Sequence, residues 1–141
     1  MPTLPSIRQF MDTTVHTLHP NTELLVAIQS LLDHHVTGAP VVSDDGELLG
    51  ILTELDCLKL LAMGSDDGDS ASGTVAEYMT KDVYSVPSKV NIYFAAGVFL
   101  GNTFRRLPVV ENGKLIGAIT RFDILRAVAK NHDLVPNWSE N

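Results

Sequence analysis

The chain has 141 residues, of which 45% are hydrophobic and 19% charged, so it is long enough for one ordinary domain or two very small ones and too apolar to be disordered. Its formal net charge of −7 argues against a nucleic-acid partner, because a broad contact with a phosphate backbone needs clustered basic residues. The single cysteine, Cys57, excludes an intrachain disulfide and a cysteine-based zinc site, and with an N-terminus unlike a signal peptide it favours a cytoplasmic location.

The first half of the chain predicts a short helix at residues 7–11, followed by the order β-α-β-β-α. Hydrophobic spacing and turn residues place these elements at 15–18, 22–34, 39–43, 47–52 and 55–62. Residues 64–73 are polar, acidic and rich in Gly and Ser, which is typical of a flexible linker.

The second half predicts the same order after a short helix at 74–78. Its elements are expected at 82–86, 89–101, 107–111, 114–120 and 122–129, and the tail at 131–141 is mostly polar. Asn112-Gly113 is a strong signal for a type I′ turn between the last two strands. The apolar run 92–100 is too short to cross a bilayer, which takes roughly 20 residues, so we expect a soluble protein without membrane insertion. Because this helix is apolar nearly all round, we expect it to associate further, in a homodimer.

The two halves align as an internal repeat. Met11 falls on Met79 at an offset of 68, and the Pro-Val-Val of 40–42 falls on that of 108–110. One residue is lost in the turn that follows, after which the offset is 67. Length changes are tolerated in turns, so the gap lies where a duplicated fold would accept it. The sequence therefore predicts an α/β protein with repeats at 1–63 and 74–130, a linker at 64–73 and a tail at 131–141.

Both repeats carry the pattern Gly-h-h-Thr-x-x-Asp at the end of a strand, where h is an apolar residue. Thr53 and Asp56 belong to the first copy, and Thr120 and Asp123 to the second. One interpretation is a capping box that starts the following helix. The other is a ligand site, because α/β proteins place ligands at the carboxyl ends of strands and a carboxylate accepts hydrogen bonds from ribose hydroxyls. The two roles are compatible.

The sequence resembles a tandem pair of cystathionine-β-synthase (CBS) domains, or Bateman module, over about residues 7–130. The resemblance rests on Gly-Ala-Pro-Val-Val at 38–42 with Gly-Ile-Leu-Thr-Glu-Leu-Asp at 50–56, and on Arg-Leu-Pro-Val-Val at 106–110 with Gly-Ala-Ile-Thr-Arg-Phe-Asp at 117–123. It implies two β-α-β-β-α units packed sheet to sheet about a pseudo-twofold axis. It also implies two clefts that bind AMP, ADP, ATP or S-adenosylmethionine as regulatory ligands, with no obligatory cofactor.

The resemblance assigns roles to individual residues. Asp56 and Asp123 would hold ribose, with Thr53 and Thr120 near ribose or phosphate. The residues before Pro-Val-Val would reach phosphate, which makes Arg106 the main candidate, with Arg105 beside it and Arg121 from the second motif; a solvated face is the alternative for these arginines. The adenine pocket would contain the following residues: Thr14, Val15, His16, Gly38, Ala39, Pro40, Asp82, Val83, Tyr84, Leu107 and Pro108. Tyr84 would stack on the base or pack in the core.

The repeat also predicts how the two clefts differ. The first copy has Thr37 and Gly38 where the second has Arg105 and Arg106. We therefore expect the clefts to be alike in ribose recognition and unlike in phosphate binding.

The function predicted from these features is a regulatory sensor that binds an adenosine ligand and acts on a separate, unidentified target protein. The alternative is a structural module for dimerisation or docking, whose Thr-x-x-Asp motifs only cap helices. An enzyme is disfavoured because no nucleophile, base or metal cluster is recognisable. We do not expect the histidines at 16, 19, 34 and 35 to form a metal site, and we expect Cys57 to be a small core residue.

Overall fold

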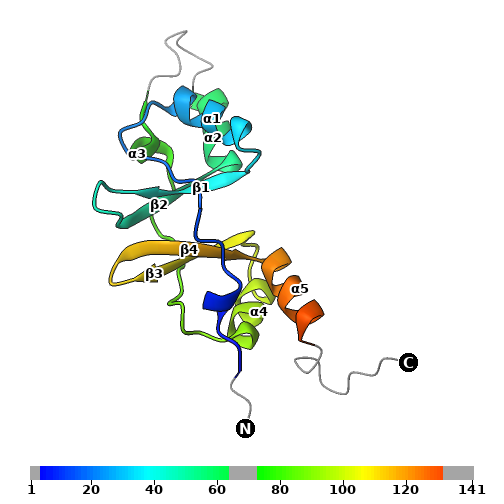
Figure 1. Ribbon diagram of the computed structural model, residues 1–141. Helices are drawn as coiled ribbons and strands as arrows, with labels where there is room; N and C mark the ends of the chain where they lie inside the picture. The colour runs from blue at the N-terminus through cyan, green and yellow to red at the C-terminus, as the bar shows by residue number, and fades with distance from the viewer. Residues whose placement is uncertain (1–3, 64–72, 132–141) are drawn as a thin grey trace. The chain divides into compact units, whose positions relative to one another are not determined.

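The computed structural model describes residues 4–63 and 73–131 (Figure 1). Its elements in chain order are the 3-10 helix η1 (Ile7–Gln9), α1 (Leu24–Asp33), β1 (Gly38–Val42), β2 (Leu48–Thr53), α2 (Glu54–Met63), α3 (Val75–Tyr78), α4 (Ile92–Leu100), β3 (Arg106–Glu111), β4 (Lys114–Thr120) and α5 (Arg121–Lys130). The expected linker and tail lie outside the described residues, apart from Gly73 and Asn131. No helix in the described part of the chain combines the length and apolarity that a membrane crossing requires.

The described residues form two compact units that interleave along the chain. Unit 1 combines residues 4–14, 85–111 and 116–131, and unit 2 combines residues 15–63, 73–84 and 112–115. Each unit therefore contains most of one repeat and the short segment that begins the other repeat in sequence. The sequence repeats and the compact units of the fold do not coincide.

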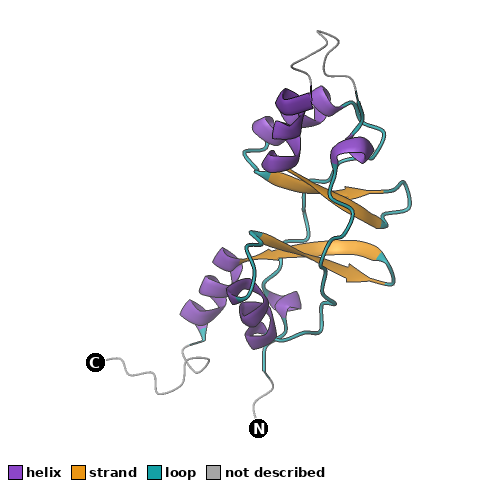
Figure 2. Cartoon of the chain, turned by 180° about the vertical axis from the view of Figure 1, so that it is seen from behind, coloured by secondary structure: helices purple, strands orange, loops and turns teal. Residues whose placement is uncertain are grey.

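Each unit is built on a two-stranded antiparallel hairpin with helices on one face (Figure 2). In unit 2, β1 pairs with β2 so that Gly38 lies opposite Thr53, and a bulge interrupts the register between Val41 and Val42. The strands β3 and β4 pair across the turn at Asn112 and Gly113, and unit 1 holds both strands except Lys114 and Leu115, which belong with the turn to unit 2. The φ angles of Asn112 and Gly113, 53° and 80°, are both positive, as the expected type I′ turn requires.

The strands expected at 15–18 and 82–86 are wrong, since each region contributes only one bridging residue. In unit 2, Leu18 donates to the Pro40 carbonyl at 2.9 Å and accepts from the Val42 amide at 2.9 Å. The next ladder bonds on either side would need amide protons from Pro40 and Pro20, which proline lacks.

The same bridge in unit 1 joins Val86 to Val109. Pro108 blocks extension of this ladder on one side, because it has no amide proton. On the other side the Ser88 amide donates to the Glu111 carboxylate at 3.3 Å instead of to a strand. Prolines without amide protons, and in unit 1 a Ser88 amide that bonds to a side chain, thus limit both regions to single bridges.

A separate core fills each unit. The fully buried side chains include Ile7, Leu107 and Ile119 in unit 1, and Leu24, Leu52 and Val75 in unit 2. Ile7 and Val75 come from the two short segments, η1 and α3, that join the other repeat. Burial of one large apolar side chain is worth roughly 1.5–3 kcal/mol, so these two residues anchor their segments.

Two Thr-x-x-Asp sites

Both Thr-x-x-Asp motifs form capping boxes at a strand-to-helix junction. The Thr53 amide donates to Asp56 Oδ2 at 2.9 Å, and the Asp56 amide donates to Thr53 Oγ1 at 3.3 Å. The corresponding distances for Thr120 and Asp123 are 2.8 Å and 3.2 Å. The capping interpretation is therefore confirmed in both repeats. Asp56 and Asp123 are buried, with 4% and 7% of their surfaces exposed.

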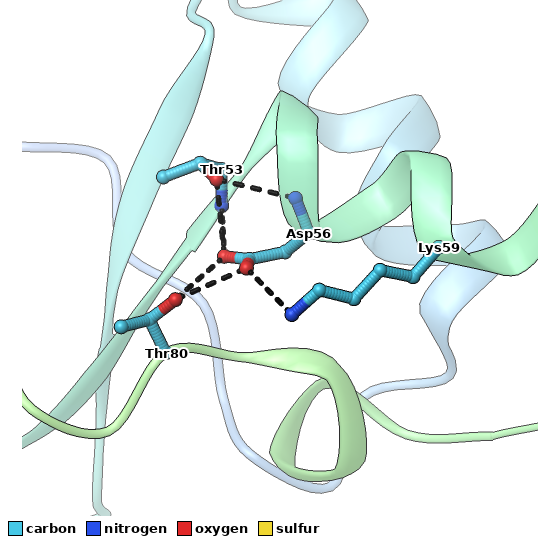
Figure 3. A network of polar contacts seen from close by, with 4 residues as sticks. All are labelled: Thr53, Asp56, Lys59 and Thr80. Atoms are coloured by element: carbon cyan, nitrogen blue, oxygen red, sulfur yellow. Dashed lines mark hydrogen bonds and ion pairs between the residues drawn. The ribbon is translucent and has the colours of Figure 1, made fainter.

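Asp56 accepts further hydrogen bonds from side chains around it (Figure 3). Thr80 Oγ1 lies 3.0 Å from Oδ1 and 3.3 Å from Oδ2, and Thr53 Oγ1 donates to Oδ2 at 3.1 Å. Lys59 Nζ, one helical turn along α2, is 3.4 Å from Oδ1. Thr80 follows α3 and pairs with Ile51 of β2 through two backbone bonds of 2.9 Å. The first residues of the second repeat thus bring a donor to the motif Asp of the first repeat.

Asp123 has a different set of neighbours. Arg126 donates from Nη2 to Asp123 Oδ1 and to the Phe10 carbonyl, the latter at 3.5 Å. Asp12 pairs with Ala118 through two backbone bonds of 2.9 Å, as Thr80 does with Ile51. Hydrogen bonds from the Thr14 amide and hydroxyl, at 2.9 Å and 2.8 Å, lower the pKa of Asp12. The charges of Arg106 and Arg126 lower that pKa further.

Each motif begins with a glycine because another chain segment passes too close to leave room for a side chain. A Cβ on Gly50 would lie 2.7 Å from the Thr80 carbonyl oxygen, and a Cβ on Gly117 would lie 2.7 Å from that of Asp12. Both distances are shorter than any real Cβ contact, and the obstacle is backbone rather than a flexible side chain. The glycines let a second chain segment pair with β2 and β4.

The three predicted phosphate-binding arginines all belong to unit 1. Arg106, in β3, is half-buried, and its guanidinium makes no hydrogen bond or ion pair with the described residues, although its charge acts on Asp12. Arg105 is exposed. Arg121 donates to the Phe104 carbonyl at 3.0 Å and lies 6.0 Å from the centroid of the Phe99 ring. Arg106 therefore has the guanidinium least committed to other groups of this chain.

The residues predicted to form the adenine pocket are divided between the two units. Thr14, Leu107 and Pro108 belong to unit 1, and the remaining members belong to unit 2. Ala39, Pro40, Leu107 and Pro108 are buried in the unit cores, whereas Tyr84 is 45% exposed. The strand prolines and their neighbours thus contribute to packing.

His16, another predicted pocket residue, packs against α1. Its ring stacks on His34 with the centroids 3.6 Å apart, and its Nε2 forms a 2.8 Å hydrogen bond with Ser30 Oγ. Burial lowers the pKa of His16, and the neighbouring His34 lowers it further. Across the described residues, no three His, Cys, Asp or Glu side chains come together where they could hold a metal ion.

Comparison with protein families assigns both repeats. The CBS domain model matches residues 7–63 and 75–130. The chain belongs to the CBS domain family. The tandem CBS pair predicted from the repeat is therefore confirmed, and so is its fold class.

Several CBS proteins are similar to this chain over most of its length. The crystal structure of CBSX2 of Arabidopsis thaliana in complex with AMP superposes with a TM-score of 0.80 at 31% identity, covering 91% of this chain and 98% of that one. A 17.7 kDa protein of Acidianus ambivalens is 33% identical over 129 residues, or 91% of this chain and 76% of its own length. MJ1225 of Methanocaldococcus jannaschii is 32% identical over 125 residues. This chain spans 43% of the length of MJ1225 and 58% of that of the chloroplastic CBSX2 sequence.

Four residues around the two Thr-x-x-Asp motifs were not predicted from the sequence. Lys59 and Arg126 occupy equivalent positions three residues after the motif Asp, and i,i+3 pairing on a helix is a signal that could have found them. Thr80 and Asp12 are also equivalent in the repeat, at the offset of 68. The sequence around Thr80 and Asp12 does not indicate that they pair with β2 and β4, because that pairing depends on which segment joins which unit.

Proposed function

We propose that this CBS protein is a regulatory module that binds an adenosine-containing ligand at its Thr-x-x-Asp motifs and acts on a separate partner protein. The candidate ligands are AMP, ADP, ATP and S-adenosylmethionine. The observation that carries the proposal is a buried Asp at the same strand-to-helix junction of both repeats, in a chain 31% identical to the AMP-bound CBSX2. A carboxylate in this position can accept hydrogen bonds from the vicinal hydroxyls of a ribose.

The proposed roles follow the chemistry of each side chain. Asp56 and Asp123 bind ribose hydroxyls, and Thr53 and Thr120 lie beside them near ribose or phosphate. Arg106, assisted by Arg105, pairs with phosphate in the site of unit 1, because a guanidinium forms paired bonds to phosphate oxygens. Arg121 is a weaker phosphate candidate, since the Phe104 carbonyl already holds its guanidinium. The adenine would lie against exposed or half-buried members of the predicted pocket, such as Tyr84 and Val83.

Exposed apolar surface on the helices supports self-association of the chain as part of this function. Each unit exposes large apolar side chains on its helices, and such surfaces mark interaction sites. In unit 2 they belong to α1 and α2, and the most exposed are Leu32, Leu55 and Leu61. In unit 1 they belong to α4 and α5, and the most exposed are Leu100, Phe122 and Leu125. We propose that a second copy of the chain covers these faces in a homodimer.

A catalytic role has little support in the described residues. Cys57 is the only cysteine, and burial and the nearby Asp56 raise the pKa of its thiol, whereas an activated nucleophile needs a lowered pKa. The single cysteine fits a reducing compartment such as the cytoplasm.

The second candidate function is a structural module without a nucleotide. It is favoured by the completeness of the capping boxes, which by themselves account for Thr53, Asp56, Thr120 and Asp123. Under this alternative the motifs stabilise helices, and the helical faces bind a partner.

A thermal-shift panel separates the two functions. AMP, ADP, ATP and S-adenosylmethionine are added to the protein at millimolar concentration, with GMP and inorganic phosphate as controls for the base and the charge. A ligand that binds only the folded state stabilises it by about 2.7 kcal/mol at a hundred times its Kd. We expect at least one adenosine ligand to raise the Tm more than GMP does. If none does, the structural module stands instead.

A further inference from the structure

The two motif carboxylates differ in how many hydrogen bonds they already accept. An ionised carboxylate has about four acceptor positions. Asp56 receives donors from the Thr53 amide and hydroxyl, from Thr80 Oγ1 and from Lys59 Nζ, and these occupy all of them. Asp123 receives donors from the Thr120 amide and from Arg126 among the described residues. The carboxylate in unit 1 thus keeps acceptor capacity that its counterpart in unit 2 has used.

Among the described residues, Asp56 has two hydroxyl donors with no counterpart at Asp123, from Thr53 and from Thr80, and the second reflects a residue exchange in the repeat. Thr80 and Asp12 sit on segments that pair in the same way with Ile51 and Ala118. The hydroxyl of Thr80 donates to Asp56. An ionised carboxylate at the same place cannot donate, and Asp12 instead accepts from the amide and hydroxyl of Thr14. Exchanging Thr for Asp at this position therefore removes a donor from the motif carboxylate.

We propose that the Thr80 hydroxyl occupies Asp56 in place of a ribose hydroxyl, so that the Asp56 site is closed by the chain itself and the Asp123 site takes the ligand first. This inference rests on the proposed function. A ribose hydroxyl would bind the carboxylate through the same kind of O–H to O⁻ bond that Thr80 makes at 3.0 Å. It would have to displace Thr80, which is itself exposed and can turn away. Figure 3 shows Thr53, Thr80 and Lys59 all pointing to the one carboxylate.

A specificity difference between the two sites follows. Ribose can bind Asp56 only by breaking the hydrogen bond from Thr80 to this charged acceptor, and that cost weakens ribose binding at Asp56 by roughly tenfold. The sites then differ in ribose recognition as well as in phosphate recognition, where only the second repeat has arginines, Arg105 and Arg106, before Pro-Val-Val.

The test isolates the Asp56 site and removes the hydroxyl. Asp123→Asn keeps a helix cap but removes the carboxylate of unit 1, and Thr80→Val keeps the shape and the backbone amide of residue 80 without a donor. AMP binding is measured by isothermal titration calorimetry for wild type, D123N, T80V/D123N and T80S/D123N. We expect T80V/D123N to bind AMP about tenfold more tightly than D123N, whereas T80S/D123N, which keeps the hydroxyl, binds like D123N. T80A/D123N is a second variant without a hydroxyl, and circular dichroism confirms that each variant is folded.

The outcomes separate this inference from the proposed function. If wild type binds AMP but neither T80V nor T80A tightens binding in the D123N background, the inference is wrong and the proposed function stands. If wild type does not bind AMP but T80V/D123N does, Thr80 closes the site as proposed and the wild-type chain is not an AMP sensor. If no variant binds AMP or, in the same titrations, ADP, ATP or S-adenosylmethionine, both ideas are overturned.

Discussion

At the scale of single residues, the motif Asp serves the fold whether or not a ligand binds. Asp56 and Asp123 each cap a helix and pair with the cation three residues later. These interactions offset the free-energy cost of burying the two carboxylates, and no ligand is needed for that. The two sites nevertheless differ at the equivalent positions Thr80 and Asp12. Removing the side chain of Asp123 should therefore cost stability as well as ligand affinity, and binding tests must be read against the stability of each variant.

The motif glycines give a prediction about close backbone contact. Gly117→Ala should destabilise the fold by about 1–3 kcal/mol, because its Cβ would meet the Asp12 carbonyl oxygen and force the paired segment to move. Gly50→Ala should do the same against Thr80. Urea unfolding measures both, with Gly97→Ala as the matched control, because a Cβ there meets nothing within 4 Å. If Gly50→Ala and Gly117→Ala were both as stable as Gly97→Ala, the close backbone contact would be contradicted.

The stacked histidines give a prediction about pH. The pKa of His16 is lowered in the folded protein, so the unfolded chain binds a proton more readily. The fold should be most stable above the unfolded pKa of about 6.5 and should lose stability as pH falls below it. His16→Gln should reduce the loss of unfolding free energy between pH 7.5 and pH 5.5.

The control for this prediction is His35→Asn, because His35 is exposed and has a φ of 54°, which Asn tolerates. It should retain the pH dependence of the wild type. An equal pH dependence in His16→Gln and wild type would show that the stack does not contribute to it.

At the scale of elements, the short segment that begins each repeat packs into the unit that holds most of the other repeat. The Ile7 amide donates to the Val90 carbonyl at 2.9 Å, and Arg8 donates to the buried Ser88 at 3.0 Å. In unit 2 the Val75 amide donates to the Thr22 carbonyl at 2.9 Å. Each repeat therefore depends on the residues that begin the other one, so cutting the chain between the repeats would not separate the two units.

This arrangement gives a prediction that distinguishes it from two independent repeats. Ile7→Ala should cost about 2–5 kcal/mol, because Ile7 is fully buried in the unit 1 core. Hydrogen exchange should show the loss of protection at residues 85–131, although residue 7 belongs by sequence to the first repeat. Leu4→Ala is the control, since Leu4 is 51% exposed. Loss of protection confined to residues 15–63 would contradict the interleaved units.

At the scale of the whole molecule, each unit leaves apolar helical surface exposed. Leu125 of α5 is 63% exposed and Leu61 of α2 is 74% exposed, in a chain that carries a net charge of −7. A covering partner would bury this area and gain roughly 25 cal/mol per Å² of apolar surface. A second copy of the chain is the partner we propose.

Light scattering tests this association. The wild type should have twice the monomer mass of 15.3 kDa at micromolar concentration. The double variant Leu58→Glu with Leu125→Glu should be monomeric, because it places charges on exposed apolar positions of both units. Lys130→Glu, at the exposed end of α5, controls for added negative charge. A wild type that is monomeric at this concentration would overturn the homodimer.

The amino-acid sequence by itself determined the repeat, both hairpins, the helices and the capping boxes. These features depend on local spacing: apolar residues at helical intervals, Asn112-Gly113 in a turn, and Thr followed three residues later by Asp. For the same reason the sequence located Asp56 and Asp123 as the centres of the candidate sites.

Only the tertiary structure decided which segment joins which unit. The bond from Thr80 to Asp56 spans 24 positions, and the bond from Arg126 to the Phe10 carbonyl spans 116. Such contacts depend on the path of the backbone, and no local pattern of side chains encodes that path. The expected strands at 15–18 and 82–86 were wrong for a related reason, because Pro40 and Pro108 of the partner strands lack the amide protons that longer ladders would need. The backbone path also puts Thr80 beside Asp56, whereas the equivalent residue of the other unit is Asp12, so the two carboxylates have different hydrogen-bond partners.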